Sequence, residues 1–235
     1  QLEACYARVA GRLPQVVTIV GETGSGRSRL VYELKQRLTP EPRLFEARCS
    51  ALNRRVPFHP WTAMLRDYFG IRADDAPEAA LRRVAARVAA LGPEVQRRAP
   101  FLYHMLSLPA GDVADVPEGD LERETFDAVG HIFHAEAQTA PVVVVLEDVH
   151  WIDGPSLAMV ERAIAKLQHA PLMIVLTCRP EFEVRWATTA VQTQLRLRRL
   201  PDDAATAIVR NVAGGALPGA LEQQILARAE GSPFY

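Results

Sequence analysis

The sequence contains few cysteines and almost no lysines. Its three cysteines, Cys5, Cys49 and Cys178, are widely spaced and form no C-x-x-C motif, so the sequence indicates neither a disulfide framework nor a zinc site. This use of cysteine fits a reducing cytoplasm. Lys35 and Lys166 are the only lysines among 27 basic side chains, and the rest are arginines. An excess of arginine of this kind can arise from a GC-rich genome.

The chain also lacks a basic excess and a long apolar run. Its formal net charge of -1 argues against a domain that binds nucleic acid through phosphate contacts. No apolar stretch approaches the length of a membrane span, and the chain does not open with the charged and then apolar pattern of a signal peptide. We therefore expect a cytoplasmic domain that contacts neither a membrane nor nucleic acid.

What the sequence does contain is an alternation of short apolar segments and helical patterns. The predicted strands are 16–20, 44–47, 142–146, 172–177 and, less regular and therefore at an edge, 194–197. Apolar residues recur three or four positions apart between these segments. This order predicts an α/β fold with a parallel five-stranded sheet between helices, in which 16–20 is the central strand.

After Pro201 the character of the sequence changes. Residues 201–235 show helical periodicity without intervening strands. We expect them to begin a small helical domain that packs beside an α/β domain of residues 1–200. We also expect the chain to be part of a longer protein.

The most informative segment joins the first strand to a helix through a glycine-rich turn. It consists of Gly21, Glu22, Thr23, Gly24, Ser25, Gly26, Arg27 and Ser28. The segment matches the phosphate-binding pattern G-x-x-x-x-G-K-[ST], except that an arginine replaces the lysine. Glycines allow successive N–H groups and the start of the helix to point at a phosphate. The hydroxyl of Ser28 is a candidate Mg²⁺ ligand, and the alternative is a glycine-rich turn that binds nothing.

Arg27 is the exception that bears on activity. A guanidinium keeps the charge of lysine but is larger, planar and forked. Lys35 lies about two turns further along the helix and cannot easily reach back. The substitution therefore predicts that phosphate binding survives at weak or moderate affinity, while hydrolysis is slow.

Two more strands end in charged side chains. The strand 142–146 leads into Glu147 and Asp148, which resembles a Walker B element. One carboxylate of such a pair holds Mg²⁺ and the other polarises the attacking water. The usual order assigns the metal to Glu147 and the water to Asp148, although the reverse order stays open. Arg179 follows the strand 172–177 and either senses the γ-phosphate, which we favour, or lies on the surface.

Four motifs in this order resemble the AAA-type ATPase modules of the signal-transducing STAND class. The motifs are residues 21–30, 146–153, 177–182 and 229–235. The resemblance is strongest to modules next to bacterial class III adenylate/guanylate cyclase domains and in large LuxR-type regulators. It implies a P-loop NTPase fold that binds ATP or ADP with Mg²⁺, through a loop that extends to Arg29. It further implies that Arg179 is the sensor-1 arginine and that Pro233 stacks near adenine.

These features predict an ATP-binding regulatory module, which is a P-loop ATPase if it is active. In this hypothesis the nucleotide closes the helical segment onto the sheet, and the movement reports to an effector domain in the same polypeptide, either a cyclase or a DNA-binding domain. The alternative is a degenerate, nucleotide-free scaffold for protein–protein contact. A DNA-binding regulator would need a helix-turn-helix, which this segment does not supply.

Overall fold

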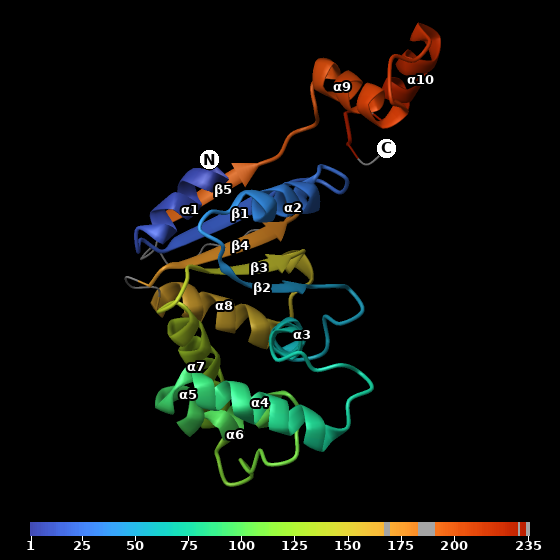
Figure 1. Cartoon of the computed structure of the whole chain (residues 1–235). Helices are drawn as coiled ribbons and strands as arrows, with labels where there is room; N and C mark the ends of the chain where they lie inside the picture. The colour runs from blue at the N-terminus through green and yellow to red at the C-terminus, as the bar shows by residue number, and fades with distance from the viewer. Residues whose placement is uncertain (167–169, 183–190, 230, 234–235) are drawn as a thin grey trace.

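A computed structural model describes residues 1–166, 170–182, 191–229 and 231–233 of the chain. Its centre is one sheet of five parallel strands, ordered β2-β3-β4-β1-β5 (Figure 1). The strands are β1 (Gln15–Val20), β2 (Arg43–Arg48), β3 (Val142–Glu147), β4 (Leu172–Cys178) and β5 (Val191–Arg196). The predicted α/β fold with a parallel five-stranded sheet is therefore confirmed.

The position of the first strand differs from the prediction. The middle strand is β4, and β1 lies between β4 and the edge strand β5. Apolar composition identifies strands that are buried on both faces but does not rank them, because β1, β3 and β4 are all mostly buried. The strand order depends on how many strands each connection crosses. The connection from β1 to β2 crosses two strands, β4 and β3.

Helices cover both faces of the sheet. They are α1 (Leu2–Ala10), α2 (Arg27–Arg37), α3 (His59–Tyr68), α4 (Pro77–Leu91), α5 (Pro93–Arg97), α6 (Ala99–Met105), α7 (Glu118–Glu136), α8 (Gly154–Lys166), α9 (Asp202–Ala213) and α10 (Gly219–Ala229), with a 3-10 turn, η1 (Val149–Trp151). Apolar residues of α1 and α2 form one core with one face of the sheet, and those of α3 to α8 form another with the opposite face.

The alternation of side chains along β3 explains how one strand serves both cores. Val142, Val144 and Leu146 belong to the core under α3 to α8, whereas Val143 and Val145 belong to the core under α1 and α2. Successive side chains of a strand point to opposite faces, so a strand between two layers must be apolar throughout. The sheet is thereby held rigid on both sides, with its carboxyl ends pointing to one edge.

The two last helices stand apart from these layers. Figure 1 shows α9 and α10 beyond an extended segment that follows β5, away from the helices that cover the sheet. They contact each other, and Arg210 of α9 forms an ion pair with Glu222 of α10 at 2.8 Å. Within the described residues, no helix is long and apolar enough to cross a membrane. The domain boundary at residue 200 stays a prediction.

Candidate functional site

The charged ends of the strands and the glycine-rich loop meet at the carboxyl edge of the sheet. This edge borders a cavity of about 780 Å³. The loop contributes residues 22–29, the strand ends contribute Arg48, Asp148 and Arg179, and the C-terminal segment contributes Ile208, Asn211, Val212 and Pro233. His150 and Trp151 of η1 complete the lining. Of the predicted site residues, Gly21 and Glu147 lie next to this cavity without lining it.

The loop needs its glycines for two different reasons. Gly24 and Gly26 have φ values of 79° and 89°, a region that other residues rarely adopt. Gly21 instead lacks space, because a Cβ there would lie 2.4 Å from Ser25 Oγ. Gly26 immediately precedes α2, so the loop leads directly into the positive end of a helix of 11 residues. The backbone is therefore shaped as an anion cradle.

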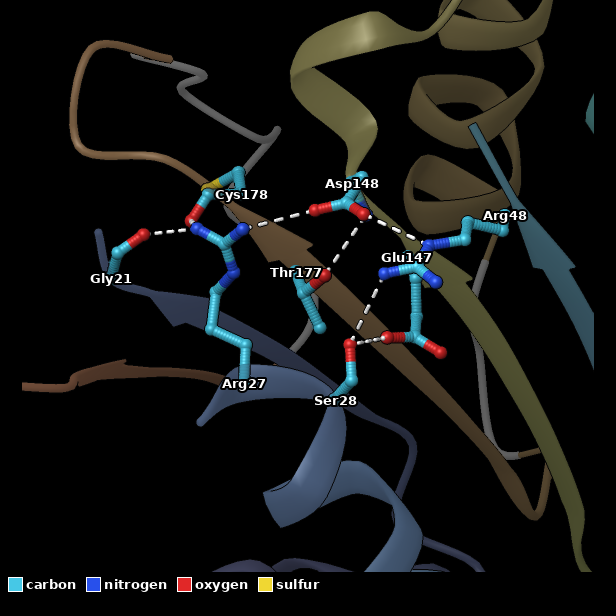
Figure 2. A network of polar contacts seen from close by, with 8 residues as sticks. All are labelled: Gly21, Arg27, Ser28, Arg48, Glu147, Asp148, Thr177 and Cys178. Atoms are coloured by element: carbon cyan, nitrogen blue, oxygen red, sulfur yellow. Dashed lines mark hydrogen bonds and ion pairs between the residues drawn. The ribbon is translucent and has the colours of Figure 1, made fainter. Parts of the chain in front are cut away.

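Arg27 does not extend into the cavity as a free cation. Its side chain is only 10% exposed. The guanidinium donates to the backbone oxygen of Gly21, to that of Cys178 at 3.0 Å, and to Asp148 Oδ1 at 3.0 Å (Figure 2). Arg27 thus joins the carboxyl ends of β1 and β4 to the acid that follows β3.

Glu147 and Asp148 have different partners. The hydroxyl of Ser28 donates to Glu147 Oε2. Asp148 accepts hydrogen bonds from two arginines. Arg27 donates to its Oδ1, and Arg48 Nε donates to its Oδ2 at 3.0 Å. Figure 2 shows Ser28 and Glu147 on one side and Asp148 between Arg27 and Arg48 on the other. The two neighbouring acids therefore belong to two separate parts of the site: one corner formed by Ser28 and Glu147, and another formed by Asp148 with its two arginines.

The backbone at Asp148 explains this divergence. Asp148 adopts a left-handed conformation with φ of 57°, and its N–H donates to Thr177 Oγ1 at 2.9 Å. The chain turns sharply there into η1, so the two carboxylates leave the strand in different directions.

Several polar atoms around the cavity have no hydrogen-bond partner among the described residues. Ser25 Oγ, Arg179 Nε and both ring nitrogens of His150 are buried without a hydrogen bond among the residues that the structure describes. Burial is the main cause that lowers the pKa of His150, so the ring is neutral near pH 7 and offers one donor and one acceptor. Buried polar groups are normally satisfied, so unpaired ones at one cavity fit a polar ligand. Arg179 also lies 6.0 Å from the ring of Trp151.

The C-terminal segment touches the loop directly. Ser232 Oγ donates to the backbone oxygen of Gly24 at 3.1 Å. A Cβ on Gly26 would lie 3.4 Å from Pro233 Cγ. Arg29, in contrast, extends outward and forms an ion pair with Glu33 at 2.6 Å. Pro233 thus lies over the loop, while Arg29 lies at the rim of the cavity.

Arg48 and the α9 residues that line the cavity lie outside the predicted motifs. Arg48 is the last residue of β2, so an inspection of every strand end, rather than of known motifs alone, would have found it. Nothing in the sequence pattern of Ile208, Asn211 and Val212 distinguishes them from other residues of an amphipathic helix.

The donor set suits phosphate and a hard cation. Arginines and a helix start attract anionic oxygens, and the oxygens of Ser28, Glu147 and Asp148 are ligands of the type that Mg²⁺ takes. In the described part of the chain, no group of three His, Cys, Asp or Glu side chains could hold a metal ion. A metal here would need further oxygens from phosphates and water, as is usual for Mg²⁺.

Comparison with known proteins identifies a family that matches most of the chain. The family described as "AAA ATPase domain" matches residues 1–175. An uncharacterised protein of Rhizobium meliloti (strain 1021) is 28% identical over 194 residues, which are 80% of this chain and 18% of that protein. The chain thus spans less than a fifth of this relative's length.

Among the solved structures that resemble the chain, two that cover most of it are each 12% identical to it. One is a Signal Transduction ATPase with Numerous Domains (STAND) protein with a tetratricopeptide repeat sensor from Pyrococcus horikoshii. Its TM-score is 0.48, over 97% of this chain and 28% of that one. The other is Drosophila ORC bound to DNA, with a TM-score of 0.44 over 92% of this chain and 44% of that one.

Proposed function

This chain belongs to the AAA ATPase domain family, and on that premise we propose that the cavity at the carboxyl edge of its sheet binds ATP or ADP with Mg²⁺. One observation carries the proposal. The cavity of about 780 Å³ gathers an anion-binding loop, two strand-end arginines and an acid, and it is closed on one side by Pro233. Such a combination of a helix start, cations and an acid matches the requirements of phosphoryl transfer.

In this proposal the loop 21–28 and the start of α2 hold the phosphates. Ser28 and Glu147, which are hydrogen-bonded to each other, hold the metal. Mg²⁺, when bound, would neutralise charge on the phosphate oxygens. Pro233, which lies over Gly26 and lines the same cavity, is proposed to pack against the base.

Asp148 is proposed to polarise the attacking water, and Arg179 to contact the γ-phosphate. Both oxygens of Asp148 already accept hydrogen bonds from arginines, so one of these bonds must be given up before the carboxylate can accept one from water. Arg27 is buried and donates to three acceptors, so it is less able than a mobile lysine to follow charge that develops on a transferring phosphate. We therefore propose slow hydrolysis.

We further propose that the module is a regulatory part of a larger cytoplasmic signalling protein of the STAND type. Contacts of Ser232 and Pro233 with the loop give the helical segment a direct connection to the state of the cavity. A change in that contact would reach an effector domain, a cyclase or a DNA-binding domain, elsewhere in the polypeptide.

A second candidate is the nucleotide-free scaffold. The observation in its favour is that two side chains of the protein itself, Arg27 and Arg48, form ion pairs with Asp148. A site that satisfies its own charges can persist as a purely structural feature.

Calorimetric titration of the full chain with ATP and with ADP, each with and without Mg²⁺, separates the two candidates. We expect saturable binding at weak to moderate affinity that strengthens with Mg²⁺. The matched control is Gly26→Val, since a β-branched residue is strained at φ of 89° and would crowd Pro233; it should bind neither nucleotide while its circular dichroism stays that of the wild type. Absence of binding by the wild-type chain at millimolar nucleotide would favour the scaffold.

A further inference from the structure

Arg48 is a cation that none of the predicted motifs contains. It ends β2, and the register of β2 with β3 places it directly opposite Glu147. Its side chain lines the same cavity as the loop. From there it reaches across the end of β3 to the acid on the other side (Figure 2).

The two arginines that share Asp148 differ in their freedom to move. Arg27 is 10% exposed and donates to two backbone oxygens in addition to the carboxylate. Arg48 is 64% exposed, and its hydrogen bonds go to Asp148 Oδ2 and, at a long 3.5 Å, to Ser28 Oγ. An exposed ion pair contributes little to stability. Arg48 can therefore leave its partner readily, whereas Arg27 cannot.

The position of Arg48 also points to what it would bind instead. Its guanidinium lies between Ser28, at the metal corner of the proposed site, and Asp148, the proposed partner of the attacking water. The terminal phosphate of a triphosphate would have to lie between these corners. A guanidinium forms paired, charge-assisted hydrogen bonds with phosphate oxygens.

We propose that Arg48 exchanges Asp148 for the terminal phosphate of a bound nucleoside triphosphate and so distinguishes ATP from ADP; this inference rests on the proposed function. With a diphosphate Arg48 stays on Asp148, because no third phosphate competes for it. With a triphosphate Asp148 Oδ2 loses its hydrogen bond from Arg48 and can accept one from water, while Oδ1 stays on Arg27. Arg48 thus couples recognition of the third phosphate to release of the acid.

The test compares Arg48→Ala and Arg48→Lys in the full chain by calorimetric titration with Mg²⁺ and either ATP or ADP. The matched control is Arg54→Ala, which removes the same charge from an exposed turn after β2 that does not line the cavity. We expect Arg48→Ala to raise the Kd for ATP by about tenfold or more, as for the loss of one charged hydrogen bond, and the Kd for ADP by less than about twofold. Arg48→Lys should recover part of the loss, and Arg54→Ala should change neither value.

Equal changes for ATP and ADP, or no change for either, would refute the inference, since Arg48 would then act on the cavity as a whole or only on Asp148. Arg48 is exposed, so its replacement should leave the fold intact, and thermal unfolding of each variant checks this directly. The wild-type titration isolates the underlying proposal: if the unaltered chain binds neither nucleotide, the proposed function fails and this inference fails with it.

Discussion

At the scale of single residues, the site is organised around one carboxylate shared by two arginines. Asp148 gives one oxygen to Arg27 and the other to Arg48. The nearby Ser28 and Glu147 instead bond to each other. The charges of these side chains are therefore balanced by partners within the protein, and each side chain can be tested separately.

Arg27→Lys should raise the rate of phosphate release, by as much as roughly 10²–10³-fold, the effect of one well-placed donor. Two separate nitrogens of the Arg27 fork reach Gly21, Cys178 and Asp148, whereas the ammonium of lysine is a compact point charge on a flexible stem and does not reproduce this geometry. The ammonium of Arg27→Lys would therefore be free to stay in contact with the phosphate oxygens as charge develops on them. Steady-state phosphate release by both proteins under identical conditions is the measurement, with Arg27→Ala as the control for loss of charge. Rapid hydrolysis by the wild type, without a gain in Arg27→Lys, would show that Arg27 already clamps the phosphates.

Ser28→Ala should abolish most of the gain in ATP affinity that Mg²⁺ provides. The hydroxyl is one of the two protein ligands proposed for the metal, and it also orients Glu147. The ratio of Kd values without and with Mg²⁺ should fall by roughly tenfold. Ser50→Ala, outside the cavity, is the control. An unchanged ratio in Ser28→Ala would remove this residue from the metal site.

At the scale of elements, Glu136 anchors the helices under the sheet. This side chain, at the end of α7, is 4% exposed. It accepts from Arg43 of β2 at 2.9 Å, from Arg87 of α4 at 2.6 Å and from Tyr68 of α3. Burial by itself raises the pKa of Glu136, but Tyr68 and the two arginines outweigh burial, so the pKa lies below its ordinary value.

Glu136→Gln should lower the free energy of unfolding at pH 7 by about 1–3 kcal/mol, toward the lower value because both arginines are half exposed. A carboxyl whose pKa is lower in the folded state adds stability above its unfolded pKa of about 4.5 and loses it as the pH falls through the folded pKa. The difference between wild type and variant should therefore shrink below about pH 4.5. Urea unfolding at a series of pH values measures this difference in the free energy of unfolding, with Glu94→Gln, at an exposed position, as the control. A difference independent of pH would mean that charge plays no part.

At the scale of the whole molecule, the helical segment is joined loosely to a rigid sheet. Only Ala205 of α9 and Ala229 of α10 are buried in these two helices. Val212, which faces the cavity, is largely exposed. Few buried contacts allow a segment to open and close at low free energy.

Bound nucleotide should slow amide hydrogen exchange in residues 202–229, because a ligand that contacts both the loop and α9 stabilises the closed arrangement. Exchange in β3 and β4 should stay slow in both states, which provides an internal control. Pro233→Ala should reduce the protection in 202–229 without altering that of the strands. Equal exchange with and without saturating ADP would show that the segment does not respond to the cavity.

Much of this architecture follows from local pattern. Strands such as β3 and β4 are recognisable because burial on both faces demands an uninterrupted apolar run. The loop 21–28 is recognisable because its backbone requires glycine at fixed positions. The weaker β5 begins at Val191 rather than residue 194, since pairing with β1 extends a strand whose own alternation of polar residues is a faint signal.

Local sequence patterns predict the fold class and most of the candidate site residues, because buried strands and tight turns restrict the residue types that can form them. Only the folded chain shows that β4 is the middle strand, that Arg27 contacts Asp148, and that Arg48 and α9 line the same cavity. These features arise from contacts between segments far apart in the chain. No local pattern encodes them, because strand order and side-chain partners are selected only when the whole sheet has assembled.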